Sequence, residues 1–303
     1  MGIKLETRRR YRLQLWFFFR WMRRWDWPFP SNAGEMDVAI SEFVNSMWLN
    51  GDPYGYACDV VSGMGRFLPQ CRKKLVVSRQ YLRNWSSTLH RKRAFPISSS
   101  FLQALVGCAL AYEDEISAAL LAVGFACMLR TEELLLLCPM NVQFSAPLHQ
   151  AFITLESTKT SRWKNSAEVV YLSDPSIVRL LYNVCAAGEP SRPIFAGKAK
   201  EFSSVLRSYA LRLGFRHPRL SLYSLRRGGA AWHFATWASY DKTCEAGRWA
   251  QIRTARIYID GAIAEHRPLC LSHSHLERMT KAQSFARHYL ASLGIQPGLR
   301  TSG

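Results

Sequence analysis

The segment LSLYSLRRGGAAWHFATWASYDKTCEAGRWAQIRTARIYID, residues 220–260, decides how the rest of the chain is interpreted. It places Arg226 ahead of two glycines and an aromatic run, and Tyr258 follows nine residues after Trp249. A phosphodiester repels nucleophiles, so cutting it without a metal requires fixed cations on its oxygens and a positioned hydroxyl. A guanidinium matches two phosphate oxygens, an indole N–H donates, and a phenol can attack to form a phosphotyrosine. We interpret the Arg-Arg-Gly-Gly stretch as a turn, with a helix over residues 230–237 behind it.

The whole chain has a globular composition and is strongly basic. Its 303 residues are 48% hydrophobic and 20% charged, which suffices for one large or two modest domains and excludes a disordered tail. The formal net charge of +18, with a pI near 9.9, favours a polyanionic partner, either nucleic acid or an anionic membrane surface. The longest apolar runs, residues 13–19 and 116–129, are shorter than the roughly 20 residues that cross a bilayer. We therefore expect no transmembrane helix.

The cysteines and histidines indicate neither disulfides nor a metal. Eight cysteines are scattered without a C-x-x-C pair, and several stand inside apolar runs. This pattern is typical of buried, reduced thiols in an intracellular protein and argues against a zinc module. The eight histidines show no metal-binding spacing. We expect no metal and no other cofactor.

The first part of the chain predicts an extension and a helical bundle. Residues 1–35 mix arginines with aromatics, and we interpret them as a basic, poorly ordered extension. A DNA-binding arm, a nuclear address and a transit peptide are the alternatives. Residues 36–93 show helical spacing of apolar side chains and a basic flank, which predicts a small DNA-binding bundle. Residues 94–100 read as a linker because a proline and a serine cluster follow the basic run.

A larger domain over residues 101–295, followed by a tail at 296–303, completes the predicted organisation. Its apolar periodicity predicts helices over residues 101–115, 115–129, 175–187, 199–215 and 276–293. Two β-prone runs, residues 152–155 and 169–172, flank a basic polar stretch and predict a hairpin. The expected fold class is mostly α, with a small β-hairpin or sheet.

The spacing of Arg226, Trp249 and Tyr258 resembles the C-terminal active-site segment of the tyrosine recombinases, the phage-integrase family. A second match follows the apolar run at 116–129, where the family has Arg-x-x-Glu-Leu; the matching residues are Arg130, Glu133 and Leu134. The resemblance implies a helical core-binding domain and a larger catalytic domain that close around duplex DNA. It implies strand cleavage and rejoining through a 3′-phosphotyrosine, without metal, by two or more protomers on the DNA.

The resemblance also implies roles for individual residues. Arg130 and Arg226 would hold the scissile phosphate, Glu133 would support them, and Tyr258 would attack. Lys159, in the turn of the expected hairpin, matches the family's catalytic lysine and would give a proton to the leaving 5′ oxygen. Lys164 is an internal competitor for that role. Contacts to the DNA backbone are expected from Arg162, Lys164, Arg227 and Arg248.

One position departs from the family pattern. Three residues before Arg226 the family has histidine, and here the residue is Tyr223. Tyr223 and Trp249 are still expected as catalytic residues that donate hydrogen bonds to the phosphate. The ordinary pKa of a tyrosine, near 10, prevents Tyr223 from shuttling protons at neutral pH as imidazole does. An active enzyme and a catalytically silent DNA-binding protein with the same fold both remain open. A peripheral membrane or RNA-associated protein is the third interpretation.

The finer resemblance is to recombinases of eukaryotic mobile elements, such as the DIRS-like and crypton groups. The Arg-Arg-Gly-Gly stretch and Trp249 carry it. It implies DNA integration or recombination as the activity and a nuclear location. The expected partners are double-stranded DNA and further copies of the chain, and no membrane.

Overall fold

The chain folds into two units, Met1–Arg91 and Lys92–Gly303. The structure is a computed structural model that describes residues 3–89, 93–155, 167–265 and 272–293, with the backbone alone for 261–265. The division between the units falls two residues before the end of the bundle expected over 36–93.

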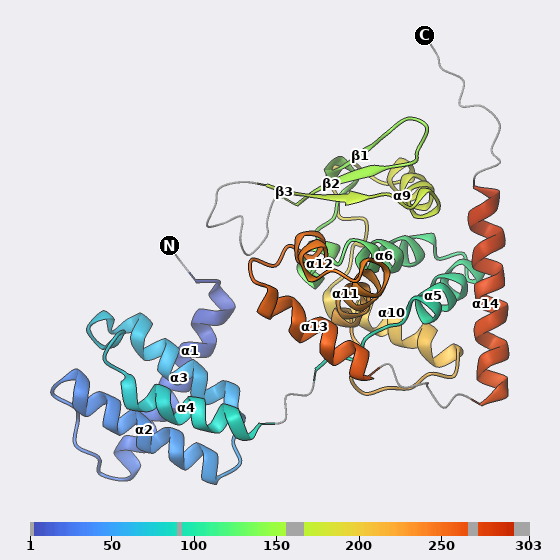
Figure 1. Cartoon of the computed structure of the whole chain (residues 1–303). Helices are drawn as coiled ribbons and strands as arrows, with labels where there is room; N and C mark the ends of the chain where they lie inside the picture. Colours follow the sequence, from blue (N-terminus) through green and yellow to red (C-terminus); the bar gives the residue numbers. More distant parts are fainter. Residues whose placement is uncertain (1–2, 90–92, 156–166, 266–271, 294–303) are drawn as a thin grey trace. The chain divides into compact units, whose positions relative to one another are not determined.

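Unit 1 is a helical bundle (Figure 1). Its helices are α1 (Leu5–Arg24), α2 (Ala33–Leu49), α3 (Tyr54–Phe67), the 3₁₀ helix η1 (Pro69–Cys71) and α4 (Val76–Thr88). The side chain of Asn32 accepts from the backbone N–H groups at 34 and 35 and so starts α2. The buried carboxylate of Asp37, on α2, accepts from the N–H groups of Val77 and Ser78 at 2.7 and 2.9 Å. The N–H groups in the first turn of a helix have no hydrogen-bond acceptor within that helix, and Asp37 supplies one for α4.

The expectation that residues 1–35 form a poorly ordered extension is wrong for α1. Phe18 and Met22 of this helix are buried in the core of unit 1, and the ring of Phe18 lies 5.5 Å from the ring of Phe43. The sequence did not predict this helix because its buried apolar side chains form only a narrow stripe at helical spacing. The many arginines on the exposed faces on either side made the segment look like a solvated, basic extension.

Unit 2 combines helices with a small antiparallel sheet, which confirms the predicted fold class. Its helices are α5 (Ser99–Ala111), α6 (Glu115–Ala126), α7 (Thr131–Leu135), η2 (Pro139–Asn141), α9 (Pro175–Ala187), α10 (Ala199–Arg212), α11 (Tyr223–Trp237), α12 (Tyr240–Gly247), α13 (Ile252–Glu265) and α14 (His273–Ser292). Among the described residues the sheet has the order β1 (Val142–Phe144), β2 (Ala151–Leu155), β3 (Glu168–Leu172). Ala151 pairs with Leu172, and Leu155 pairs with Glu168. The two predicted β-prone runs therefore do pair as antiparallel strands.

The central helix of unit 2 is α6, as its apolar run predicted. Residues 117–125 are all buried. The helix contacts α5, α9 and α11. Asp114 caps its N-terminus by accepting from the N–H of Ser117 at 3.0 Å. The cap and the burial of residues 117–125 fix α6 in unit 2, and the loop that follows it carries Arg130.

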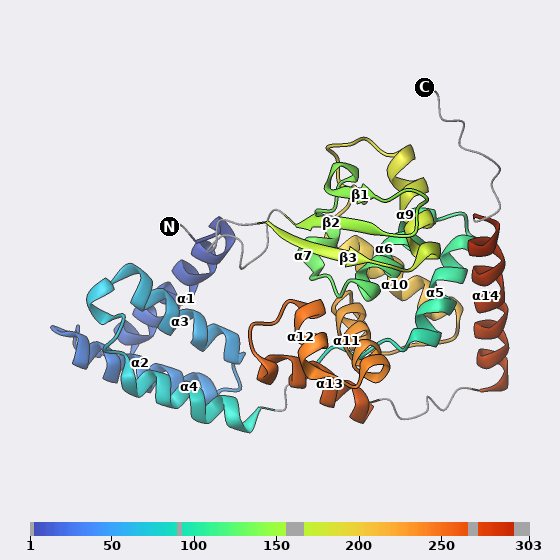
Figure 2. The ribbon, with the colours of Figure 1, turned by 45° about the horizontal axis from the view of Figure 1, so that its top comes forward.

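The Arg-Arg-Gly-Gly stretch is not a turn, because it lies inside α11. A Cβ at Gly228 would lie 1.9 Å from the carbonyl oxygen of Ile97, and one at Gly229 would lie 2.1 Å from that of Phe125. The two glycines therefore allow α11 to pack backbone against backbone on the segment before α5 and on α6. Figure 2 shows α11, α12 and α13 lying together, and contacts join each pair of them.

Helix α14 packs along α5, with the carbonyl oxygen of Ala282 only 1.8 Å from where a Cβ of Gly107 would stand. In the described part of the chain, no helix has both the length and the apolar character of a membrane span. Cysteines in the same ranges are free thiols, buried except for Cys58 and Cys138.

Candidate active site

The loop between α6 and α7 presents the first candidate arginine. Arg130 stands just before α7, and its backbone N–H donates to the Glu133 carboxylate at 2.8 Å. Its guanidinium donates to the same carboxylate. Because Glu133 is 6% exposed, the pair is anchored inside the protein while the Arg130 side chain remains partly open to solvent. Glu133 therefore holds Arg130 through both its backbone and its side chain.

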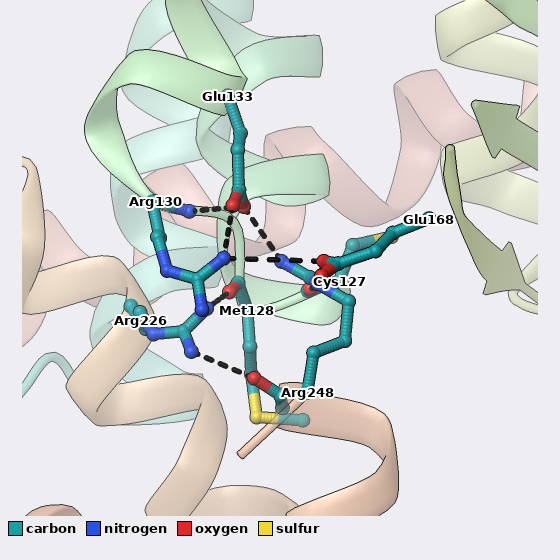
Figure 3. A network of polar contacts seen from close by, with 8 residues as sticks. Cys127, Met128, Arg130, Glu133, Glu168, Arg226 and Arg248 are labelled. Carbon is teal, nitrogen blue, oxygen red and sulfur yellow. Dashed lines mark hydrogen bonds and ion pairs between the residues drawn. The ribbon is translucent and has the colours of Figure 1, made fainter. Parts of the chain in front are cut away.

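Arg226 lies on α11 and connects three segments (Figure 3). Its side chain is 1% exposed. One terminal nitrogen donates to the carbonyl of Met128, in the α6–α7 loop, and the other donates to the carbonyl of Gly247, at the end of α12, at 2.7 Å. These bonds hold the guanidinium beside Arg130 and fix where α12 ends.

Arg248 lies inside the same cluster, not on the surface. It ends α12 with a φ of 57°, in the left-handed region. Its guanidinium donates to Glu133 at 2.6 Å and to the carbonyl of Cys127 at 3.2 Å, and it lies 3.3 Å from the carboxylate of Glu168. The prediction that Arg248 contacts the DNA backbone is therefore corrected: its geometry is that of a structural cation that joins α12, α7 and β3.

Arg227 requires the same correction. It is 2% exposed and donates to the backbone carbonyl of Ala94. Arg227 makes this bond to the segment before α5, whereas Arg226 lies against Trp249 and Tyr258, so only Arg226 is placed to meet a phosphate at the candidate nucleophile. Adjacent positions on a helix point in directions about 100° apart, and the sequence could not show that both Arg226 and Arg227 point inward.

The cluster carries a net positive charge. Among the described residues, three guanidiniums (Arg130, Arg226 and Arg248) face two carboxylates (Glu133 and Glu168), which leaves 3 − 2 = +1. Burial, aided by Arg130 and Arg248, lowers the pKa of Arg226 to about 10. Burial by itself would raise the pKa of Glu133, but Arg248 and the bonds from Arg130 outweigh it, and the net shift is downward. An additional anion would balance this cluster, and phosphate oxygens suit guanidinium groups.

Aromatic side chains cover one side of the cluster. The guanidinium carbon of Arg226 lies 4.6 Å from the ring centre of Trp249 and 6.0 Å from that of Tyr258. The rings of Trp249 and Tyr258 are 4.9 Å apart, and the hydroxyls of Tyr258 and Tyr223 share a hydrogen bond. A small second core, formed by α11, α12 and α13 around Met128, holds these rings in place.

The structure thus brings together Arg130, Tyr223, Arg226, Trp249 and Tyr258, which come from four separate segments of the chain. Lys159, Arg162 and Lys164 lie outside the described residues. The site also contains Glu168, which sequence reasoning missed. It lies 4.0 Å from Arg130, and the available signal was its place as the acidic residue that opens a β-prone run after a basic stretch.

Comparison with known proteins supports the fold. No protein-family model and no curated protein matches the sequence. The XerH site-specific recombinase, in a post-cleavage complex with a palindromic difH substrate, matches with a TM-score of 0.60 and 15% identity over 82% of this chain and 75% of its own.

Two further solved structures are similar. The Tn1549 transposon integrase in complex with transposon right-end DNA has a TM-score of 0.58 and 9% identity, over 93% of this chain and 95% of its own. A lambda integrase dimer bound to a COC′ core site has a TM-score of 0.56 and 12% identity, over 90% and 75% respectively. These similarities show that the chain has the fold of site-specific recombinases and integrases, as the motifs implied.

Proposed function

We propose that this chain is a tyrosine recombinase that cuts and rejoins duplex DNA through a covalent 3′-phosphotyrosine at Tyr258. The observation that carries the proposal is the convergence of Arg130, Arg226 and the Tyr258 side chain at one basic cluster. The fold shared with DNA recombinases and the net charge of +18 support DNA as the substrate.

The arginine cluster supplies what phosphoryl transfer requires. Arg130 and Arg226 would balance the charge of the scissile phosphate and of the transition state, which is the task a metal ion performs in other enzymes. The oxygen of Tyr258 attacks phosphorus, the bond to the 5′ oxygen breaks, and the 5′ oxygen leaves with a proton. Lys159 is the proposed donor of that proton. The reverse attack by a 5′ hydroxyl of another strand rejoins the DNA and releases the tyrosine.

Strand exchange requires two duplexes and therefore more than one protomer. We accordingly include self-association on DNA in the proposal. The lambda integrase structure similar to this chain is a dimer on its core site. Sedimentation of the protein with and without a duplex tests this part separately.

The test of the nucleophile is Tyr258→Phe on a nicked duplex, from which the cleaved strand end is lost after attack. We expect the wild type to form a covalent protein–DNA adduct that survives denaturation, and the variant to form none while it binds DNA with unchanged affinity. Tyr240→Phe is the matched control, because Tyr240 bonds to Asp260 on the exposed side of the same region. An adduct that persists in Tyr258→Phe would exclude this nucleophile.

A catalytically silent DNA-binding protein is the second candidate, and Tyr223 is the observation that favours it. Histidine is the residue expected at this position from the family pattern, and the hydroxyl of Tyr223 is bonded to that of Tyr258. A wild-type protein that forms no adduct, yet binds duplex DNA with an affinity that falls steeply with salt, would establish this alternative.

A further inference from the structure

The position of Tyr223 gives it direct access to the candidate nucleophile. Tyr223 is the first residue of α11 and stands three residues before Arg226, so the two side chains share a helix face. The ring of Tyr223 lies 5.8 Å from that of Tyr258, at an angle of 52°, and their hydroxyls share a hydrogen bond. The contact that Tyr223 makes is therefore with the attacking oxygen.

The surroundings of Tyr223 keep its proton in place. Burial and the hydrogen bond to Tyr258 raise the pKa of Tyr223 well above its ordinary value, and the positive charges of Arg226 and Arg130 offset only part of that rise. The guanidinium of Arg93, in the segment before α5, donates to the carbonyl of Ile257 on α13, next to Tyr258 in the chain. A phenol that remains protonated acts as a hydrogen-bond donor, and a donor next to an oxygen that becomes negative stabilises the charge.

We propose that Tyr223 is a catalytic residue that serves the nucleophile and not the phosphate: its hydroxyl donates to the oxygen of Tyr258 and stabilises the phenolate that attacks. This inference rests on the proposed function. Tyr258 loses its proton to solvent, and Tyr223 keeps its own. The phenolate oxygen bonds to phosphorus, the bond to the 5′ oxygen breaks, and that oxygen takes a proton from the general acid. A histidine at this position would instead carry a proton or contact the phosphate.

The first experiment measures single-turnover adduct formation on a nicked duplex between pH 6 and 10. A charge-assisted hydrogen bond of ordinary strength corresponds to about one to two pH units. We therefore expect Tyr223→Phe to slow adduct formation about tenfold to a hundredfold at pH 7 and to move the rising limb of the profile to higher pH by that interval. DNA affinity should not change, and Tyr240→Phe should behave as the wild type.

The second experiment separates the nucleophile from the phosphate. A methylphosphonate at the scissile position replaces one charged oxygen by a methyl group, which weakens any contact that acts on phosphate charge. We expect the slowing caused by Tyr223→Phe to persist at a similar factor on this substrate. A factor that disappears there, or a pH profile unchanged by Tyr223→Phe, would overturn the inference while leaving the proposed function intact. A wild-type protein that forms no adduct on either duplex would overturn both.

Discussion

Replacing Glu133 by glutamine should destabilise unit 2 far more than the loss of an ion pair on the protein surface would. The Glu133 carboxylate accepts from the backbone N–H of Arg130 at 2.8 Å, from the Arg130 guanidinium, and from Arg248 at 2.6 Å. Glutamine preserves the shape but removes the charge, so the cluster changes from 3 − 2 = +1 to 3 − 1 = +2. Breaking a buried pair from one side costs about 3 kcal/mol or more, because the remaining charges stay buried without compensation.

Glu189→Gln is the matched control for this change. Glu189 forms an ion pair with Arg192 at the same separation of three residues, with 2.8 Å between the charged groups, but both side chains are exposed. Exposed pairs contribute at most about 1 kcal/mol. The comparison therefore isolates the effect of burial.

Urea unfolding followed by circular dichroism measures both variants. With a urea dependence of about 2 kcal/mol per M, Glu133→Gln should lower the midpoint of the unit 2 transition by about 1.5 M. The midpoint of Glu189→Gln should remain close to that of the wild type. Equal midpoints for the two variants would refute the conclusion that the arginine cluster depends on the Glu133 charge.

The same difference should depend on pH. Because the pKa of Glu133 in the folded protein lies below its ordinary value of 4.5, its charge contributes stability that is fully present above that value and is lost as pH falls through the folded pKa. The stability gap between wild type and Glu133→Gln should be constant above pH 5 and should narrow below about pH 4.5. A gap that stays constant into acid would show that the charge is not its source.

Two further substitutions, each with a control, test the packing inside unit 2 and inside unit 1. Gly228→Ala places a methyl group 1.9 Å from the carbonyl oxygen of Ile97, so α11 must move by about 1 Å. A displacement of that size can slow catalysis about a hundredfold, which the rate of adduct formation measures. Gly55→Ala, which meets no atom within 4 Å, should leave adduct formation unchanged. Phe18→Ala should destabilise unit 1 by about 3–5 kcal/mol, whereas Phe17→Ala, on the exposed side of α1, should cost less than about 1 kcal/mol in the same urea titration.

Local patterns in the sequence predicted most of the helices and strands. The run from Pro175 to Ala187 predicted α9 with its observed bounds, because Asp174 and Pro175 mark a helix start and the apolar spacing has a helical period. The β-prone runs predicted β2 and β3 to within one residue, since each strand begins one residue earlier than expected. These features depend on neighbours in the chain, and a sequence shows such neighbours directly.

Long-range packing was not predictable in the same way. Gly228 and Gly229 were interpreted as a turn, although their reason for being glycine is two carbonyl oxygens that lie about 100 or more positions earlier in the chain. The burial of Arg227 and Arg248 depends likewise on partners from other segments. The motif identified which residue types meet at the site, but only the fold shows that Tyr223 faces a second tyrosine.

The two carbonyl bonds of Arg226 affect how mutagenesis of this protein should be interpreted. The guanidinium links the α6–α7 loop to the end of α12, so its removal withdraws a crosslink as well as a charge. If the alanine variant at this position is inactive, the loss of activity could not be assigned to the missing charge alone, because the local structure is also disrupted. Removing one phenolic oxygen leaves both carbonyl bonds of Arg226 in place, so Tyr223 and Tyr258 are the positions at which a loss of activity reports on the chemical step.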